Sequence, residues 1–380
     1  MRLSFATLKY YPFGGLEKSF LNICKEALRR GHELTLYCYK WQGEKLPGAN
    51  IIEVPLRSLS NHGRIEEFHA KVMAIRSRHP DDVFVGFKRM PDLDVYYNGD
   101  VCFKNEVTQK HAGWYRLTSR YRVLSSFEDA IFSPNSATQI MYVSEQERQI
   151  FQREYQTPDE RFSALPPGID KTKIRQAHDK NIGASIRAEF GATDSQLVFV
   201  MVGSDFQRKG VDRAIRAIAA LPESLRNNAQ LWVVGEGKVP RFKKLAASLG
   251  IESQVHFLGG RSDVPDILSA ANVLIHSAVT EAAGNAILEG MVSGLPVIVS
   301  RSAGFSYHVE RADAGIVVND VPFYQVSFDE AVMRISEDDA LRERLSKNGW
   351  EYADRVDLYR RPQVAMDIIE GVAQWKSERK

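Results

Sequence analysis

The sequence predicts an α/β protein made of two domains, each built around a parallel β-sheet. Short apolar runs alternate with helical patterns along the whole chain, as expected for strands buried between helices. Pro166-Pro167-Gly168 interrupts this alternation near the middle, because two prolines and a glycine continue neither a helix nor a strand. At 380 residues, 44% of them hydrophobic, the chain is long enough to bury two separate cores.

The first domain is predicted over residues 1–166 and begins with a strand, a turn and a helix. Residues 2–8 alternate as a strand does, Gly14 and Gly15 make the turn, and residues 16–30 form an amphipathic helix. This is the opening unit of a Rossmann-like domain. The glycines let backbone amides approach a ligand closely, although any tight turn can use a Gly-Gly pair.

The second domain is predicted over residues 170–350. Its strands are expected near residues 197–202, 230–234, 255–258, 273–275 and 297–299. Helical patterns separate these short runs, which indicates a second Rossmann-like sheet. Residues 351–380 are predicted to form a helical tail.

Composition excludes several classes of protein. The net charge of +2 lacks the dense basic face of a nucleic-acid-binding protein. No apolar run resembles a signal peptide or approaches a membrane span, so we expect the protein in the cytoplasm. Cys24, Cys38 and Cys102 show no metal-ligand spacing, and we expect buried free thiols.

Residues 276–300 contain the strongest candidate site. Glu281 falls in a turn after the strand at 273–275, at the sheet edge where α/β proteins bind ligands, and Glu289 lies two helical turns further on. Gly284 opens the intervening helix, and a helix start with bare N–H groups attracts phosphate. Spacing alone leaves two interpretations open: a nucleotide-sugar site, or an ordinary βαβ unit with two solvated acids.

Two adjacent cations follow another strand of the second domain. Gly203 directly follows the predicted strand at 197–202, and Arg208 and Lys209 come just before the next helix. Cations at this edge neutralise a diphosphate leaving group well, although a solvated Arg-Lys pair is the simpler alternative.

Together these motifs resemble a known family. Glu281-x7-Glu289, with Gly284 between them and Gly-Leu-Pro-Val after them, is similar to the signature of retaining glycosyltransferases with two Rossmann-like domains. Within that family the chain resembles, from end to end, the bacterial lipopolysaccharide core heptose glucosyltransferases. The closer match is carried by residues 9–16, 86–97, 165–169, 203–213 and 303–308.

The resemblance implies two Rossmann-like domains that face each other across a cleft, the glycosyltransferase type B architecture. It implies an acceptor-binding first domain, a donor-binding second domain and a tail, 351–380, that crosses back to the first. Arg208 and Lys209 would hold the donor diphosphate, Glu281 the sugar and Glu289 the ribose, with Asp100 near the reaction centre. Further donor contacts are implied at Gly14, Gly15, Lys173, Gly203, Arg261, Ala282, Ala283, Gly284 and Asn285.

No cofactor or metal is expected on the same grounds. Asp92 and Asp94 have the Asp-x-Asp spacing of metal-dependent glycosyltransferases, but the resembled family neutralises phosphate with Arg, Lys and helix ends. The chain departs from the family pattern at Ser19, where an acid is expected, and at Lys173, where an arginine is common. Donor geometry or sugar choice can therefore differ.

Two basic segments of the first domain are candidate contacts for anions. Residues 103–122 carry five Lys or Arg and one acid, interleaved with Phe103, Trp114, Tyr115 and Tyr121, which is typical of a surface that binds anionic lipid. A surface helical pair is the alternative. Residues 87–91 form a basic turn that either meets acceptor phosphates or is solvated.

The resulting hypothesis is transfer of glucose from UDP-glucose to an inner-core heptose of lipopolysaccharide, by a protein attached to the inner face of the cytoplasmic membrane. The resemblance implies a same-face reaction in which the leaving phosphate takes the acceptor proton. Three alternatives stay open: another donor such as UDP-N-acetylglucosamine or another envelope acceptor, a noncatalytic nucleotide-sugar-binding or scaffold protein, and nucleic-acid binding through residues 103–122.

Overall fold

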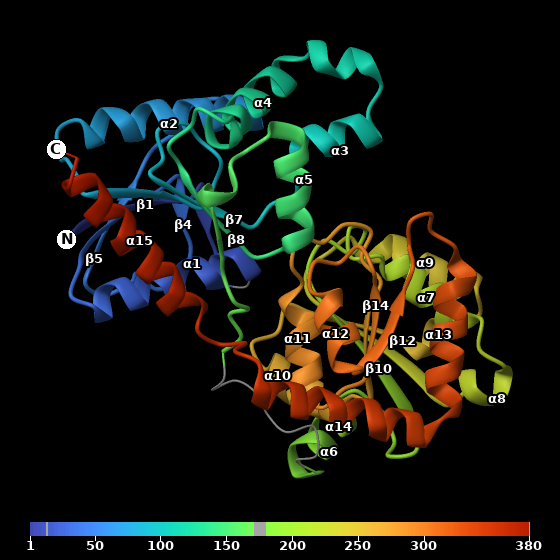
Figure 1. The fold of residues 1–380 in the computed structure, drawn as a ribbon. Helices are drawn as coiled ribbons and strands as arrows, with labels where there is room; N and C mark the ends of the chain where they lie inside the picture. Colours follow the sequence, from blue (N-terminus) through green and yellow to red (C-terminus); the bar gives the residue numbers. More distant parts are fainter. Residues whose placement is uncertain (13, 171–179, 380) are drawn as a thin grey trace. The chain divides into compact units, whose positions relative to one another are not determined.

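The computed structural model describes residues 1–12, 14–170 and 180–379 of the chain (Figure 1). It divides into two compact units. Unit 1 comprises Met1–Gly168 and Arg360–Lys380, and unit 2 comprises Ile169–Tyr359. Lys173, a predicted donor contact, lies outside the described residues.

Unit 1 contains a seven-stranded sheet in the order β5-β3-β1-β6-β7-β8-β9, and every neighbouring pair is parallel. Chain order reverses at β1, which lies between β3 and β6, and α/β sheets bind ligands above such a reversal. The strands are β1 (Arg2–Ala6), β3 (Glu33–Cys38), β5 (Ala49–Glu53), β6 (Val83–Gly86), β7 (Val95–Asn98), β8 (Gln139–Tyr142) and β9 (Phe162–Ala164), with β2 (Lys9–Tyr10) and β4 (Lys40–Trp41) as a separate pair.

Helices cover both faces of this sheet. In Figure 1, α1 and α15 lie on one side and α2 and α4 on the other. The helices are α1 (Gly15–Arg29), α2 (Asn61–Arg76), α3 (Phe103–Lys110), η1 (Gly113–Leu117), α4 (Ser119–Phe132), α5 (Glu145–Tyr155), η2 (Asp159–Arg161) and α15 (Arg361–Ser377). The sheet is therefore buried on both faces, which explains its nearly continuous apolar strands.

Unit 2 contains a six-stranded parallel sheet in the order β12-β11-β10-β13-β14-β15. This is the doubly wound Rossmann order, and its reversal lies between β10 and β13. The strands are β10 (Leu197–Val202), β11 (Ala229–Val234), β12 (Val255–Gly259), β13 (Val273–His276), β14 (Val297–Ser300) and β15 (Gly315–Val318). The predicted parallel sheet is confirmed.

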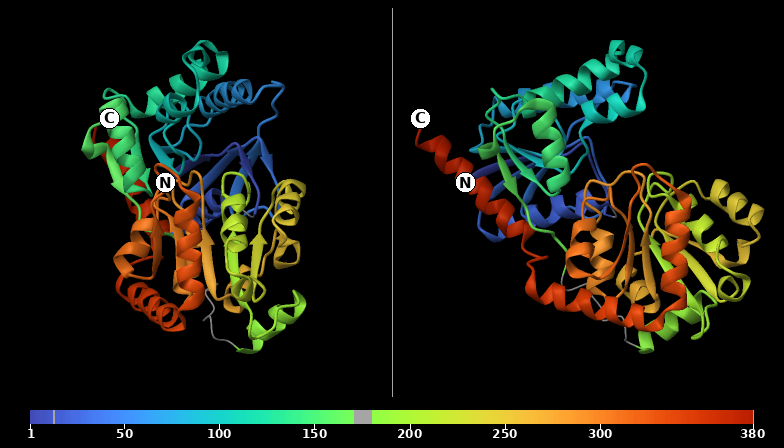
Figure 2. Two further views of the ribbon diagram at one scale, coloured as in Figure 1. Left: turned by 90° about the vertical axis from the view of Figure 1, so that its right-hand side faces the viewer. Right: turned by 45° about the vertical axis from the view of Figure 1, so that its right-hand side comes forward.

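The helices of unit 2 also form two layers. Figures 1 and 2 show α7, α9 and α13 on one face of the sheet and α10, α11 and α12 on the other. The helices are α6 (Lys180–Glu189), α7 (Val211–Ala219), α8 (Glu223–Arg226), α9 (Val239–Ser248), η4 (Glu252–Gln254), α10 (Val264–Ala270), α11 (Asn285–Val292), α12 (Ser306–Ala312), α13 (Gln325–Glu337) and α14 (Asp339–Arg355).

Each unit has its own apolar core. Phe68, Phe84, Tyr96 and Phe132 are among the buried side chains of unit 1, and the strands and helices α7 and α13 supply a second core in unit 2. Cys24, Cys38 and Cys102 are free and buried, as predicted. Within the described part of the chain, no helix is both long and apolar enough to cross a membrane.

The C-terminal helix belongs to unit 1. The predicted tail begins at residue 351, which falls inside α14, and α14 is part of unit 2. The chain returns to unit 1 only at Arg360. Arg361 fixes the return: its guanidinium is buried and donates to Pro166 O at 3.0 Å, Ser19 Oγ at 3.0 Å and Tyr97 OH at 3.2 Å. The departure at Ser19 thus has a structural use.

Replacing Arg361 by methionine should destabilise unit 1 by about 3 kcal/mol, because the buried oxygens of Ser19, Tyr97 and Pro166 lose their donor. Hydrogen exchange of α15 and thermal unfolding measure the effect. Arg29→Met is the matched control, since that side chain is 68% exposed and its partner Glu26 keeps the ion pair with Arg30, so the loss of stability should be smaller than for Arg361→Met. Equal stability of the two variants would contradict this role of Arg361.

His308 is a buried, neutral side chain that links two helices of unit 2. Its Nδ1 lies 2.7 Å from Tyr352 OH on α14, and its Nε2 has no partner among the described residues. Burial, with nearby Arg311, lowers the pKa of His308 to about 4. Above pH 6.5 the histidine is neutral in both folded and unfolded chains. Below that pH only the unfolded chain binds the proton, so stability falls.

The unfolding free energy of unit 2 should therefore decrease between pH 6.5 and pH 4, with about 3 kcal/mol of the decrease due to His308. Urea unfolding at several pH values should show a shallower decrease for His308→Gln than for the wild type. His79 is exposed and lies in unit 1, so the control variant His79→Gln should leave the unfolding curves of unit 2 as they are in the wild type. Parallel curves for wild type and His308→Gln would contradict the assignment.

Candidate active site

The candidate site of unit 2 lies where the strand order reverses. The neighbouring strands β10 and β13 both end at this edge, β10 at Val202 and β13 at His276. The loop after β10 carries Arg208 and Lys209, and the loop after β13 carries Glu281. The two loops are joined by a hydrogen bond from Val279 N to Arg208 O of 2.8 Å. Residues far apart in sequence therefore meet above the sheet.

Glu281 is the centre of a charged cluster. One of its oxygens, Oε2, pairs with Lys209 Nζ and lies 3.1 Å from Arg208 Nη1. The Glu281 and Lys209 side chains are largely buried, at 13% and 12% exposed, whereas Arg208 is 42% exposed. Burial opposes the charged carboxylate, but the two cations Lys209 and Arg208 outweigh it and hold the pKa of Glu281 well below its usual range. The carboxylate is therefore ionised at neutral pH.

Two glycines make room for this cluster. Gly203 has φ of +149°, and a Cβ there would collide with the Lys209 side chain. Gly210 has φ of +67°, and a Cβ there would collide with Ser277 O, while Ser277 Oγ donates to Gly210 O at 2.8 Å. Both positions require glycine for space and for backbone conformation. Gly203 thus supports Lys209 directly.

Sequence reasoning missed His276. This residue ends β13 and is 2% exposed, with Nε2 at 3.7 Å from Glu281 Oε2, too long for a hydrogen bond. Burial and the nearby Lys209 lower the pKa of His276, so the ring is neutral. Its Nε2 has no hydrogen-bond partner among the described residues. The available signal was a polar residue closing an apolar strand.

The loop from Glu281 to Asn285 presents the start of α11. Gly284 caps the helix with φ of +97°, and the buried Asn285 Oδ1 has no hydrogen-bond partner in the described chain. Ala282 and Ala283 lie in a segment whose backbone is held by hydrogen bonds from the loop after β14. Gly304 N donates to Glu281 O, and Phe305 N donates to Ala283 O. These hydrogen bonds fix the backbone of the loop. Asn285 Oδ1 is a buried acceptor without a partner in the described chain, so a ligand that donates a hydrogen bond fits beside it.

Two other predicted donor contacts lie apart from the Glu281 cluster. Glu289 is half-buried on α11, one turn after Asn285 and on the same helix face. Arg261 follows β12, two strands from β10, and its guanidinium pairs with Asp263 at 2.6 Å and Glu189 at 2.9 Å. The structure therefore unites Arg208, Lys209 and Glu281 directly, while Arg261 is already neutralised by carboxylates.

Unit 1 has its own charged edge near Asp100. Asp100 lies just after β7, and Lys88 Nζ, just after β6, is 3.2 Å from its Oδ2. Glu17, in the first turn of α1, interacts with both charges, and burial raises its pKa although Tyr11 and Lys88 oppose the shift. Sequence reasoning missed this carboxylate because a first-turn glutamate is common at helix starts.

Gly14 and Gly15 differ in whether the surrounding structure leaves room for a side chain. A Cβ at Gly14 would collide with the Glu17 carboxylate, which folds back over the turn, whereas a Cβ at Gly15 would meet open space. The structure thus explains Gly14 by its own packing. It gives no steric reason for Gly15.

A buried ion pair holds the loop that carries Asp100. Glu128 on α4 is fully buried, lies 2.8 Å from Arg89 Nη1, and accepts from the N–H groups of Phe103 and Lys104 at 2.9 and 3.0 Å. Arg89 also donates to Val101 O. The amides that open α3 are therefore bound by a carboxylate from another helix, which fixes the backbone on either side of Cys102.

Residues 103–122 form α3, η1 and the start of α4. Trp114 and Leu117 are 68% and 82% exposed. The prediction that Phe103 belongs to an exposed aromatic set is wrong: Phe103 is buried because Glu128 holds its N–H against the core. Tyr115 and Tyr121 are half-buried and pack edge-on against each other. The exposed apolar surface is therefore concentrated in η1.

The side chains of Asp92 and Asp94 contact different residues. Asp92 lies 2.9 Å from His69 Nε2, while Asp94 accepts from Phe84 N at 2.8 Å and pairs with Lys376 at 2.7 Å. Across the described ranges, no three His, Cys, Asp or Glu side chains are grouped as metal ligands would be.

Family models match both halves of the chain. The glycosyltransferase family 4 model matches residues 13–173, and the model of glycosyl transferases group 1 matches residues 184–352. The first covers most of unit 1 and the second most of unit 2. The fold is shared with Anabaena HepE in complex with UDP-glucose, at a TM-score of 0.75 and 19% identity over 100% of both chains.

A closer relative covers nearly the whole chain. The lipopolysaccharide glucosyltransferase WaaG of Escherichia coli K12 is 41% identical over 98% of this chain and 99% of its own. The crystal structure of WaaG superimposes with a TM-score of 0.93 over 97% of this chain and 100% of that one. The chain therefore belongs to the glycosyltransferases with two Rossmann-like domains, in the family of the lipopolysaccharide glucosyltransferase WaaG.

Proposed function

We propose that this glycosyltransferase moves glucose from UDP-glucose to an inner-core heptose of lipopolysaccharide, with retention of configuration and without a metal ion. The observation that carries the proposal is the cluster of Lys209, Arg208 and Glu281 above the β10/β13 reversal. The likeness to WaaG over the whole chain supports the choice of sugar and acceptor.

The diphosphate of the donor is assigned to the two cations. Glu281 pairs with both Lys209 and Arg208, and Arg208 Nε also lies 3.8 Å from Asp205 Oδ2. A bound diphosphate competes for the same N–H donors, and its charge increases as the bond to the sugar breaks. Two cations in a partly buried site stabilise that charge strongly, which removes the need for a metal ion.

The sugar and nucleoside are assigned to the loop and helix that follow β13. Freed from full pairing with the cations, the Glu281 carboxylate accepts hydrogen bonds from sugar hydroxyls. The backbone amides of Gly284 and Asn285, at the start of α11, are assigned to anionic oxygen of the donor. Glu289, one turn further along α11, is assigned to the ribose, and Arg261 to the nucleotide side of the donor.

The reaction is proposed to occur on one face of the sugar. The bond between the anomeric carbon and the β-phosphate oxygen breaks, and the acceptor hydroxyl oxygen bonds to the same carbon. The hydroxyl proton passes to the leaving phosphate oxygen. Asp100, held by Lys88, is assigned to the acceptor side in unit 1. No cofactor is required by this scheme.

The protein is also proposed to work as a peripheral protein on the cytoplasmic face of the inner membrane. The exposed Trp114 and Leu117 in η1 are flanked by Arg116, Arg120 and Arg122, which are exposed as well. Apolar side chains beside cations suit a surface of anionic lipid, where the acceptor of the proposed reaction resides.

Glu281→Gln should abolish transfer, with a loss of at least about a hundredfold in kcat, because both the sugar contact and the ion pair with the cations are lost. UDP should still bind, because the two cations assigned to the diphosphate remain. Mass spectrometry of a truncated lipopolysaccharide acceptor, incubated with a panel of UDP-sugars, measures transfer and identifies the donor. Glu310→Gln, an exposed carboxylate of the same unit, is the control and should keep wild-type turnover.

Three outcomes of this assay separate the alternatives. A mass increase with UDP-N-acetylglucosamine instead of UDP-glucose would replace the proposed donor. No product and no UDP release with any donor would favour a noncatalytic binding protein. Undiminished turnover of Glu281→Gln would remove the proposed sugar contact.

Trp114→Ser combined with Leu117→Ser should weaken binding to anionic vesicles, because both side chains lose apolar contact with the interface. Flotation of the protein with vesicles of phosphatidylcholine and phosphatidylglycerol provides the measurement, and raised salt should weaken wild-type binding further. Leu59 is 92% exposed in the same unit, so Leu59→Ser is the matched control. Equal flotation of the double variant and the control would contradict the assignment.

A further inference from the structure

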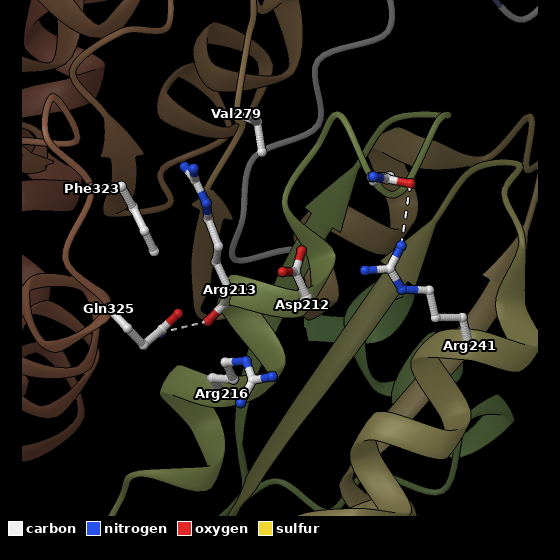
Figure 3. Close-up of a pocket in the computed structure, with 8 residues that line it drawn as sticks. Asp212, Arg213, Arg216, Arg241, Val279, Phe323 and Gln325 are labelled. Atoms are coloured by element: carbon white, nitrogen blue, oxygen red, sulfur yellow. Dashed lines mark hydrogen bonds between the residues drawn. The ribbon is translucent and has the colours of Figure 1, made fainter. Parts of the chain in front are cut away.

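Unit 2 contains a pocket whose lining residues differ from those of the Glu281 cluster. The pocket has a volume of about 510 Å³. Figure 3 shows the residues that line it, which come mainly from the start of α7, helix α9, the loop after β13 and the residues at and just before the start of α13. Its volume is within the range of roughly 300–1,000 Å³ typical of ligand sites. Arg208, Lys209 and Glu281 do not line it, so the donor chemistry leaves it unexplained.

Three arginines line the pocket, against one acid. Arg213 and Arg216 come from α7 and Arg241 from α9, and Asp212 is the single carboxylate, which leaves a net charge of 3 − 1 = +2. In the described chain, neither Arg216 nor Arg241 is paired with a carboxylate, although Arg241 donates to Gln207 Oε1 at 3.3 Å. The lining therefore favours an anion.

Arg213 is the most buried of the three and is poorly neutralised. Its nearest carboxylate, Asp320, is 3.9 Å away and already accepts from Ser302 N and Oγ at 3.0 and 2.5 Å. Its guanidinium lies 3.7 Å from the centre of the Phe323 ring and makes only long hydrogen bonds, 3.2 Å or more, to backbone oxygens. Burial lowers the pKa of Arg213, as expected for a cation without a close partner.

The segment that supplies Phe323 to the pocket carries exposed apolar side chains. Val321, Tyr324 and Val326 of this segment are 84%, 60% and 56% exposed, and Val279, which lines the pocket, is 44% exposed. Large exposed apolar side chains that follow one another in a short segment point to a binding surface. A small hydrophilic anion would use the arginines but leave these apolar side chains in water.

We propose that this pocket binds the headgroup of an anionic phospholipid, so that unit 2 has its own attachment to the membrane. The arginines bind the phosphate, and the exposed apolar side chains enter the interfacial layer. Asp212, which stands between Arg213 and Arg241 in Figure 3, accepts from headgroup hydroxyls, and this favours phosphatidylglycerol over a headgroup that carries a carboxylate.

A second attachment has a clear physical use. One weak membrane signal gives marginal, reversible binding, whereas two signals on one protein multiply their effects. The segment of Trp114 and Leu117 supplies one signal in unit 1, and the pocket supplies another in unit 2. The inference does not require transfer chemistry, because it rests only on the charges and exposed side chains of the pocket.

Arg216→Gln combined with Arg241→Gln tests the proposal, since both side chains are exposed and their loss should spare the fold. Flotation with vesicles of phosphatidylcholine containing phosphatidylglycerol should fall by about tenfold or more, because each interfacial cation contributes about fivefold. Arg334→Gln combined with Arg355→Gln removes the same charge from exposed sites of the same unit and is the matched control. Thermal unfolding verifies that both double variants are folded.

The outcomes separate the possible ligands. A selective loss by the pocket variant, on phosphatidylglycerol more than on phosphatidylserine vesicles, supports the proposal. An equal loss of flotation by both double variants would show that only the total charge of the protein matters, and this would overturn the proposal. Unchanged flotation, with glycerol phosphate in solution binding only the wild type, would assign the pocket to a soluble phosphate. Vesicle binding is measured without donor or acceptor, so failure here leaves the transferase proposal intact.

Discussion

The ion pair between Glu281 and Lys209 is the interaction around which unit 2 is arranged. A carboxylate that is 13% exposed needs a cation beside it, because an unpaired buried charge costs several kcal/mol. Lys209 reaches it only because β10 and β13 are neighbours in the sheet and because Gly203 and Gly210 carry no side chain. The charged cluster therefore depends on both the strand order and the positions of the two glycines.

The same principle organises the edge of unit 1 with different residues. Asp100 is matched by Lys88, and the loop around them is held by Glu128 and Arg89, a buried pair that also fixes the start of α3. Polar groups at the carboxyl ends of parallel strands are thus prearranged in both units. In each cluster the carboxylate is already paired with a cation, so charged groups stand ready to exchange partners when a ligand binds.

Much of this architecture could be predicted from sequence, because it depends on local periodicity. Apolar runs between helical patterns identified both parallel sheets, and Gly284 and Glu281 fell at a strand end where α/β proteins bind ligands. The pairing of Glu281 with Lys209 links residues that are far apart in the chain, and the family resemblance, rather than spacing, indicated it. Family resemblance supplied the roles of Asp100 and Arg261, and those roles remain predictions.

The features that sequence could not provide are those set by tertiary packing. His276 comes directly after the predicted strand at 273–275, and only the fold places its Nε2 3.7 Å from Glu281 Oε2. Phe103 looks like part of an exposed aromatic set, but Glu128 draws its backbone into the core. The tail boundary at residue 351 was wrong because α14 is a continuous helix that packs within unit 2, and the return at Arg361 depends on a buried hydrogen-bond network. The pocket of Arg213 is formed by segments that share no motif.

A crystal structure of the protein with bound UDP-glucose would test the account most directly. The account predicts diphosphate oxygens within hydrogen-bond distance of Arg208 and Lys209, glucose hydroxyls on Glu281, and the ribose on Glu289. UDP-glucose bound with its diphosphate elsewhere, while Lys209 and Arg208 stay paired with Glu281 alone, would contradict it.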